Sequence, residues 1–248
     1  ITMNPDFSPP KLTRTKLLDW SQALEATAPL ADLDARMAAL HPDDVCCFIY
    51  TSGTGGRPKG VMLTHRSIQA NIKAAIELLK EGNVVENQRF LSLLPLSHSY
   101  EHTAGMHLPF QIKAEVWYCE STDQIANNLV EVSPTLMTAV PRLYEVLHDR
   151  ITRGVRAKGG LSEKLFNAAV RLGTKRQHGK RLLPHEVILN IIVDRLVRTK
   201  VRGRLGGRLQ FFISGGAALN PEIGNFFMAL GINLLQGYGQ TEASPLIS

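Results

Sequence analysis

With 248 residues, of which 44% are hydrophobic, the chain can bury a core of its own, as one large domain or two small ones. It has no signal peptide and no apolar run near the length of a membrane span. The net charge of +6 is unevenly spread along the chain. Because the chain starts at Ile1 instead of a methionine, we expect it to be part of a longer protein.

The first strand is predicted over residues 45–50. Before it, residues 1–40 combine prolines with a short amphipathic stretch, so we expect a lead-in segment ahead of a main domain at 41–248. The run VCCFIY is short, apolar and β-prone, which predicts a buried strand. Cys46 and Cys47 fit packing within it. With Cys119 they form no CxxC pair and no metal-ligand spacing, which favours a reduced, cytoplasmic setting over a secreted disulfide scaffold.

A glycine-rich loop, TSGTGGRPKG, follows this strand over residues 51–60. Glycines let backbone N–H groups point into one concavity, hydroxyls add donors and Lys59 supplies a mobile ammonium, which together suit a polyphosphate. The loop is not the P-loop of kinase-type NTPases, because Gly60 follows Lys59 where that motif needs serine or threonine. Its glycine spacing also differs from the dinucleotide fingerprint, and a surface hairpin of turn residues is the alternative.

A helix is predicted after the loop. Thr64 can cap it, Gly82 lies just past its end, and its apolar residues repeat at helical spacing: Ile68, Ile72, Ile76 and Leu79. Further strands are expected in RFLSLL, EVWYC, TLMTAV, LQFFIS and INLLQG, with helices near 104–112 and 123–131, from Pro141, and after Pro221. Strands separated by helix-length segments predict an α/β fold, a parallel-rich sheet with helices on both faces. Ligands of such sheets gather at the carboxyl ends of the strands.

A basic helical section is predicted over about 162–205. Between Arg150 and Arg208 the chain has 16 lysines and arginines against 3 acidic residues, a local charge of +13. This excess suggests a nucleotide, a phospholipid surface or a nucleic acid, and a solvated helical surface explains it equally well. Phe166 is the one aromatic residue in this stretch, which argues against base stacking, so we expect no nucleic acid.

Three motifs in this order resemble those of the AMP-forming acyl-adenylate enzymes, a family that includes acyl-CoA synthetases, luciferases and non-ribosomal peptide adenylation domains. YTSGTGGRPKGVMLTH (50–65) resembles the family's signature loop, with Gly55 where the family usually has threonine. SGGAALNPEI (214–223) resembles its adenine-binding strand and turn, and GYGQTEAS (237–244) its Tyr-Gly-x-Thr-Glu motif. The resemblance implies part of the large N-terminal domain of an acyl-adenylate synthetase.

The resemblance also implies which residues bind the nucleotide, and all three motifs contribute: Thr51, Ser52, Gly53, Thr54, Gly55, Gly56, Lys59, Gly215, Gly216, Ala217, Gly237, Tyr238, Gly239 and Thr241. Thr51, Ser52, Thr54 and Lys59 would hold the β- and γ-phosphates of ATP. Adenine would lie between the Gly216–Ala217 backbone and the Tyr238 ring. Thr241 would bond the α-phosphate and Glu242 would hold Mg²⁺. Adenylation joins two anions, so the implied catalytic residues supply a cation, a donor and a metal ligand: Lys59, Thr241 and Glu242.

The segment LLPLSHSYEHTAGMHLPF (93–110) resembles the part of the family that reaches the acyl pocket, which implies an acyl-binding role for His98. A hydrogen-bonded loop histidine is the plainer interpretation. His98, Glu101 and His102 also suggest a metal site, which the lack of a tetrahedral ligand set disfavours.

The stretch VPRLYEVLHDRI, the basic insertion at about 150–208 and RLGGRLQFFISGGAALNPEI together resemble the long-chain fatty acid–CoA ligase branch. The implied reaction forms a fatty acyl-adenylate from a fatty acid and ATP, and then transfers the acyl group to CoA. A fatty substrate dissolved in a bilayer would make the basic section an anchor to an anionic membrane.

The family's small C-terminal domain, with its lysine for adenylation, would lie beyond Ser248, so we expect the fragment to be inactive alone. Two alternatives stay open: a fatty acyl-AMP ligase that delivers to a carrier protein, and a non-catalytic module that binds a nucleotide or an acyl group.

Overall fold

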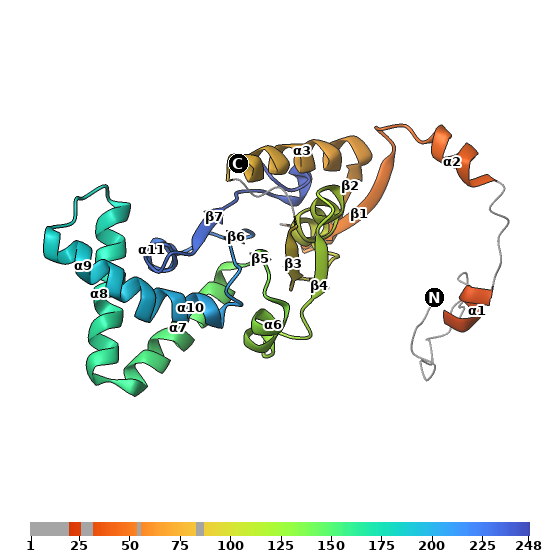
Figure 1. The fold of residues 1–248 in the computed structure, drawn as a ribbon. Helices are drawn as coiled ribbons and strands as arrows, with labels where there is room; N and C mark the ends of the chain where they lie inside the picture. The colour runs from red at the N-terminus through yellow and green to blue at the C-terminus, as the bar shows by residue number, and fades with distance from the viewer. Residues whose placement is uncertain (1–19, 26–31, 54–55, 83–86) are drawn as a thin grey trace. The chain divides into compact units, whose positions relative to one another are not determined.

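The computed structural model describes residues 20–25, 32–53, 56–82 and 87–248, and the chain divides into two units, Ile1–His41 and Pro42–Ser248 (Figure 1). In the first unit, helices α1 (Trp20–Glu25) and α2 (Leu33–Ala39) bury none of their residues. Across the described ranges, no helix is both long and apolar enough to cross a membrane.

The second unit begins with a hairpin. Strand β1 (Val45–Thr51) pairs antiparallel with β2 (Lys59–Thr64), and Thr51 lies opposite Lys59. The predicted first strand is therefore confirmed, but the glycine-rich loop leads into a second strand and not directly into a helix. The loop is that of a hairpin.

The prediction that this first strand is buried is wrong. Within β1 only Ile49 is buried, whereas Tyr50 is 72% exposed and Cys46 is also exposed. The physical reason is that a two-stranded hairpin packs one face against its neighbours, so that alternate side chains face solvent. Packing within the strand therefore accounts for Cys47, which is partly buried, and not for Cys46.

Helix α3 (His65–Glu81) has the predicted caps. The Thr64 hydroxyl accepts from the Ser67 backbone N–H, and the Ser67 hydroxyl accepts from the Thr64 backbone N–H, which forms a capping box. Gly82 follows at the carboxyl end, and α3 buries Ile68, Ile72 and Leu79.

A five-stranded parallel sheet forms the centre of this unit. Its strands are β3 (Arg89–Ser92), β4 (Glu115–Tyr118), β5 (Leu136–Ala139), β6 (Phe211–Ser214) and β7 (Asn233–Gln236), in the order β4-β3-β5-β6-β7. The chain goes from β3 to β4 on one side and then to β5 on the other. Loops that follow neighbouring strands diverge at such a reversal, which leaves a crevice at the carboxyl ends of the strands.

Helices connect the strands as predicted. A helical segment between β3 and β4 consists of α4 (Ser99–Glu101), a π-helical stretch (His102–His107) and α5 (Leu108–Gln111). The other connections are α6 (Ile125–Val132), α7 (Pro141–Lys158), α8 (Gly160–Gln177), α9 (Pro184–Val193), a π-helical turn (Asp194–Arg198), α10 (Thr199–Arg204) and α11 (Pro221–Ala229).

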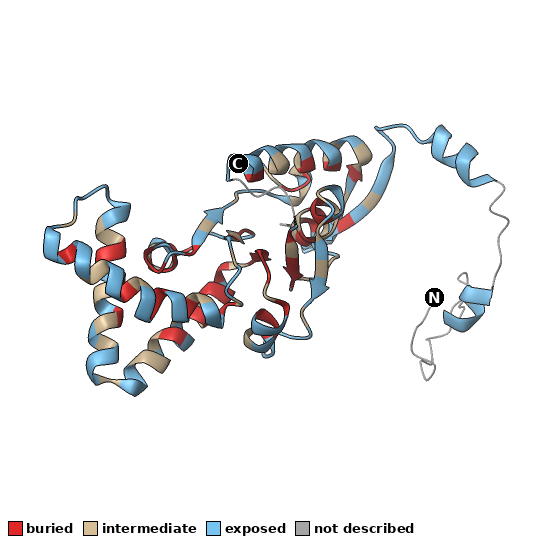
Figure 2. Cartoon of the chain, viewed as in Figure 1, coloured by how far each residue is buried: buried red, intermediate tan, exposed pale blue. Residues whose placement is uncertain are grey.

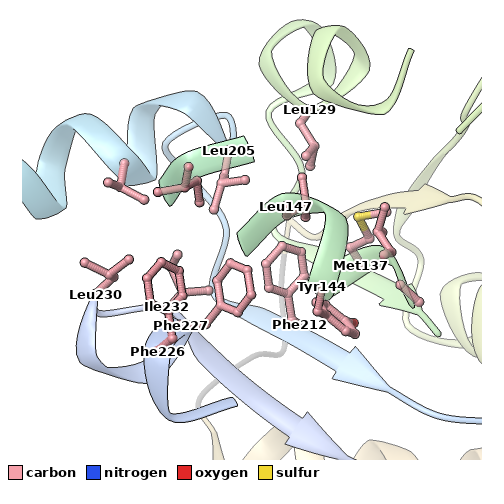
Figure 3. Close-up of a cluster of buried hydrophobic side chains, with 14 of the residues drawn as sticks. Leu129, Met137, Tyr144, Leu147, Leu205, Phe212, Phe226, Phe227, Leu230 and Ile232 are labelled. Atoms are coloured by element: carbon pink, nitrogen blue, oxygen red, sulfur yellow. The ribbon is translucent and has the colours of Figure 1, made fainter. Parts of the chain in front are cut away.

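Both faces of the sheet are covered, since neighbouring residues of one strand enter different cores. Strand β3 is accordingly buried over most of its length (Figure 2). Phe90 and Leu136 pack with α3 and the hairpin, and Leu91 and Met137 pack with the helices of the other face. This second core contains three aromatic rings in mutual contact, Tyr144, Phe212 and Phe227, with centroids 5.1, 5.8 and 6.1 Å apart (Figure 3). The predicted α/β fold is confirmed.

Candidate functional site

A cavity of about 380 Å³ lies at the carboxyl ends of the strands. The loops after β3, β6 and β7 contribute to its wall, together with α3 and the end of β1. Among the predicted site residues, those that line it are Thr51, His98, Gly215, Gly216, Gly237, Tyr238, Gly239, Thr241 and Glu242. The structure thus brings parts of all three motifs and the predicted acyl-binding histidine to one cavity.

The remaining predicted residues lie beside this cavity or elsewhere in the hairpin. Lys59 is the cross-strand partner of Thr51, and Ala217 directly follows Gly216. Ser52, Gly53 and Gly56 belong to the hairpin loop and are not part of the cavity wall. Thr54 and Gly55 lie outside the described residues.

The glycines of the hairpin loop are required by its backbone. Gly53 has φ +54° and Gly56 has φ +74°, a region that favours glycine. A Cβ atom on Gly53 would lie 2.6 Å from the carbonyl oxygen of Arg57 and 3.4 Å from Cγ of Lys59. The loop is therefore tight, and it holds the stem of Lys59 against Gly53.

The two glycines after β6 have different tasks. A Cβ atom on Gly215 would lie 2.9 Å from the ring of Tyr100, whose hydroxyl donates to the carbonyl oxygen of Ile213 at 2.8 Å. Gly216 has φ +82° and is exposed at the cavity. Gly215 thus makes room for an aromatic ring, and Gly216 turns the backbone.

The segment from Tyr238 onward folds back on itself. The Tyr238 N–H donates to the Ser248 carbonyl oxygen at 2.7 Å, and its carbonyl oxygen accepts from Ile247 N–H at 2.9 Å. Thr241 to Ala243 form one 3-10 turn, and the hydroxyls of Thr241 and Ser99 lie 3.1 Å apart, within hydrogen-bond distance. Tyr238 is 63% exposed and lines the cavity, so its side chain is accessible to a ligand.

Asn71 on α3 fixes this segment, and the sequence did not indicate it. Its Nδ2 donates to the Ala243 carbonyl oxygen at 3.0 Å, and its Oδ1 accepts from the Leu246 N–H at 2.5 Å. Thr103 adds a bond from its hydroxyl to the Ser244 carbonyl oxygen at 3.3 Å. The one sequence signal was a polar residue beside the apolar stripe of α3, which is too common to identify a site.

Glu101 is a second residue with an unforeseen role. It is fully buried, and it accepts hydrogen bonds from the hydroxyls of Ser92 on β3 (2.6 Å) and Thr138 on β5 (2.8 Å). Burial raises the pKa of its carboxyl, and these hydrogen bonds act against that shift. Glu101 therefore joins the helical segment to two strands at the crevice.

His98 has a structural contact of its own. Its Nδ1 accepts from the Tyr100 N–H at 3.2 Å, which caps α4, and the residue also lines the cavity. A metal site of His98, Glu101 and His102 does not form, because both Glu101 oxygens are taken by hydroxyls and no group of three His, Cys, Asp or Glu among the described residues is placed to hold a metal ion.

One wall of the cavity is apolar. It consists of side chains from α3, from residues 104–108 and from β6: Ala75, Leu78, Leu79, Ala104, Leu108 and Ile213. The cavity thus combines glycine backbone, hydroxyls and the Glu242 carboxylate with a surface suited to an alkyl chain.

The sequence matches the family model described as AMP-binding enzyme over residues 5–248. Long chain acyl-CoA synthetase 6, peroxisomal, of Arabidopsis thaliana is 38% identical over 211 residues, which cover 84% of this chain and 28% of that protein. Long-chain-fatty-acid--CoA ligase FadD15 of Mycobacterium bovis is 32% identical over 228 residues, 88% of this chain and 36% of that protein. The chain thus spans only 28% and 36% of the length of these relatives.

Solved structures share the fold. The N-terminal domain of FACL13 from Mycobacterium tuberculosis superimposes with a TM-score of 0.53 at 19% identity, over 90% of this chain and 48% of that one. A long-chain-fatty-acid-CoA ligase, FadD1, from Archaeoglobus fulgidus gives 0.53 at 21% identity, over 84% and 34%.

Proposed function

Since the chain belongs to the AMP-binding enzyme family, we propose that it is the central part of a long-chain fatty acid–CoA ligase. This enzyme would form a fatty acyl-adenylate and pyrophosphate from a fatty acid and ATP. The CoA thiol would then attack the acyl-adenylate to give the acyl thioester and AMP. The observation that supports this proposal is the single cavity in which Thr51, Tyr238, Thr241 and Glu242 meet an apolar wall. The long-chain relatives support the choice of substrate class.

In this proposal the nucleotide lies along the loops at the carboxyl ends of the strands. Adenine packs on the Tyr238 ring opposite the Gly216 backbone, because an exposed aromatic face and a side-chain-free backbone form a slot for a flat base. The hairpin loop with Thr51 and Lys59 takes the β- and γ-phosphates through backbone N–H groups and an ammonium. Thr241 bonds the α-phosphate with a hydroxyl that Ser99 holds in place.

Glu242 fits the role of a magnesium ligand. Its carboxylate is exposed, lines the cavity and forms no ion pair with the rest of the described chain. Magnesium is commonly bound by one or two carboxylates plus phosphate oxygens, so a three-ligand protein cluster is not needed. The ion, when bound, would neutralise charge on the phosphates.

The apolar wall would orient the fatty acid. An alkyl chain against Ala75, Leu79 and Leu108 would direct its carboxylate toward the polar side of the cavity, where His98 and Thr241 lie. The barrier to adenylation comes from bringing two anions together, and Lys59 with the hydroxyl donors would offset the negative charge that builds up on phosphorus.

Thermal unfolding with three ligands tests this proposal: Mg-ATP, AMP and a non-hydrolysable palmitoyl-adenylate mimic. The mimic should stabilise the chain well beyond AMP, because it also occupies the apolar wall; a ligand at about 100 times its Kd adds about 2.7 kcal/mol. Ala75→Phe should reduce the thermal stabilisation by the mimic and leave the stabilisation by AMP unchanged. Ala74 is exposed on the same helix, so Ala74→Phe should change neither. Equal stabilisation by mimic and AMP, or equal behaviour of the two variants, would contradict an acyl site here.

We also propose that the section Arg150–Arg208 contacts an anionic membrane surface through its excess of cations. Sedimentation with vesicles that contain phosphatidylglycerol should show binding at low salt that falls at high salt, because salt screens exposed charges. An absence of binding at low salt would end this part of the proposal.

A further inference from the structure

A second cavity, of about 190 Å³, lies between α7, α8, the π-helical turn and α10. It shares no lining residue with the large cavity. Its wall is apolar for the most part, from Ile151, Val155, Leu165, Phe166, Val197 and Val201. Three cationic side chains complete it: Lys158 from α7, and Lys200 and Arg204 from α10.

Two of the three acidic residues of this section, Glu186 and Asp194, pair with cations outside the second cavity. Glu186 binds Lys175 at 2.5 Å and Arg171 at 3.3 Å. Asp194 faces Arg198 at 3.8 Å and Arg202 at 3.7 Å. The protein thus uses two of the three carboxylates of this section away from the second cavity.

The three cations at the second cavity therefore keep their charge available. Lys158, Lys200 and Arg204 form no ion pair within the part of the chain that the structure describes, and all three are exposed. The Nη1 atom of Arg204 lies 3.8 Å from the position that a Cβ atom of Gly154 would occupy, so this guanidinium sits at the cavity wall. A set of uncompensated cations around an apolar hollow attracts an anion that carries apolar surface.

An exposed apolar face adjoins this cavity. Leu196 lines the cavity and is 46% exposed, and Ile192 and Ile188, at successive intervals of four residues before it, are 42% and 63% exposed. Residues four apart lie on one side of a helix. The apolar lining thus continues through Leu196 onto the surface of α9.

We propose that the second cavity binds the head of an anionic amphiphile, a phosphate or carboxylate joined to an alkyl chain. The anionic head binds Lys158, Lys200 and Arg204. The first part of the alkyl chain lies on Val155 and Phe166, and the rest of the alkyl chain follows the exposed face of α9. Inorganic phosphate alone would leave the apolar lining unused, and a neutral lipid would leave the cations unpaired. The volume is below the roughly 300 Å³ of pockets that enclose a whole small ligand, which fits partial enclosure.

Isothermal titration calorimetry of the chain with dodecyl phosphate tests this proposal. Dodecyl phosphate should bind more tightly than inorganic phosphate and than the neutral amphiphile dodecyl maltoside. Lys200→Gln with Arg204→Gln should weaken its binding about tenfold or more, because two of the three cations that bind the head lose their charge. Lys180→Gln with Arg181→Gln, the same loss of charge in the loop before α9, should weaken it less than about threefold.

Gly154→Leu separates a built cavity from general charge. Leucine fills the hollow without changing any charge, so this variant should weaken the binding of dodecyl phosphate by a similar factor. It should not lower the unfolding temperature, because leucine is favoured over glycine in a helix by about 1 kcal/mol.

If both cavity variants also weaken binding to phosphatidylglycerol vesicles, the head comes from a bilayer lipid. If only dodecyl phosphate is affected, a soluble amphiphile is the ligand. The proposal is wrong if wild type binds dodecyl phosphate no better than inorganic phosphate, or if the cavity variants match the loop variant.

Discussion

At the scale of single residues, Glu101 shows how the crevice between β3 and β5 is held together. A buried carboxyl is expensive unless its oxygens find donors, and here both oxygens accept from hydroxyls of the two strands. Gly105 allows this arrangement, because a Cβ atom there would overlap the Glu101 carboxyl. The helical segment that carries His98, Ser99 and Tyr100 is thereby fixed to the sheet.

Glu101→Gln should change how stability depends on pH. Burial raises the folded-state pKa above 4.5, so the stabilisation by the neutral carboxyl is complete below the unfolded-state pKa and is lost as pH rises through the folded-state value. Glutamine cannot ionise, so the difference in the free energy of unfolding should move in favour of the variant between about pH 5 and about pH 8. Urea unfolding of both proteins at the two pH values measures it. An equal difference in the free energy of unfolding between the two proteins at both pH values would show that Glu101 does not titrate in this way.

At the scale of elements, α3 does more than cover the sheet. Its apolar residues pack on the hairpin and on β3, and Asn71 ties the segment Ala243–Leu246 to the same helix. In the helical segment after β3, the Ser99 hydroxyl lies within hydrogen-bond distance of the Thr241 hydroxyl, and Thr103 donates to the Ser244 carbonyl oxygen. The turn that carries Thr241 and Glu242 is therefore positioned by two elements far from it in the sequence.

Asn71→Ala should loosen this turn. The two lost hydrogen bonds involve partly buried backbone groups, so we expect a loss of about 1 to 3 kcal/mol and faster hydrogen exchange at the Leu246 N–H. Affinity for Mg-ATP should fall with it. Lys73→Ala, exposed on the same helix, is the matched control and should leave both unchanged. Unaltered exchange at Leu246 in the Asn71 variant would mean that α3 does not hold the turn.

The sequence predicted most elements and not the contacts that position the site. Strands such as RFLSLL and TLMTAV stand out because they are short apolar runs between helix-length segments, and Thr64 marks the start of α3. Strand β2 was missed because Lys59 and Gly60 look like loop residues, and its inward side chains, Val61 and Leu63, are too few to show a period. The sequence did not indicate the contacts of Glu101 with Thr138 or of Asn71 with Ala243, because these partners lie 37 and 172 residues away.

At the scale of the whole molecule, the parallel sheet explains why motifs distant in the sequence meet. Strands β3, β6 and β7 all end at one edge, so the segments after them, His98, Gly215 and Tyr238 among them, enter one cavity. The ring cluster of Tyr144, Phe212 and Phe227 stabilises this sheet from the face that carries α7 and α11 (Figure 3). The site depends on the core for its geometry.

Phe227→Ala should therefore destabilise the unit Pro42–Ser248 by about 3 to 5 kcal/mol, because the ring is fully buried and its removal leaves a hole between two other rings. Phe110→Ala removes a ring that is 67% exposed and should cost far less, within about 0.5 kcal/mol. Guanidinium unfolding gives both values. A similar small loss for the two variants would contradict the packing of this core.

The central claim is that the hairpin loop and the Tyr238–Glu242 segment hold one nucleotide between them. A crystal structure of the chain with Mg²⁺ and a non-hydrolysable ATP analogue tests it most directly. We expect adenine against Tyr238 and Gly216, the α-phosphate at Thr241, and the outer phosphates at Thr51 and Lys59 with the metal on Glu242. A nucleotide bound elsewhere, or one that touches only one of the two segments, would contradict it.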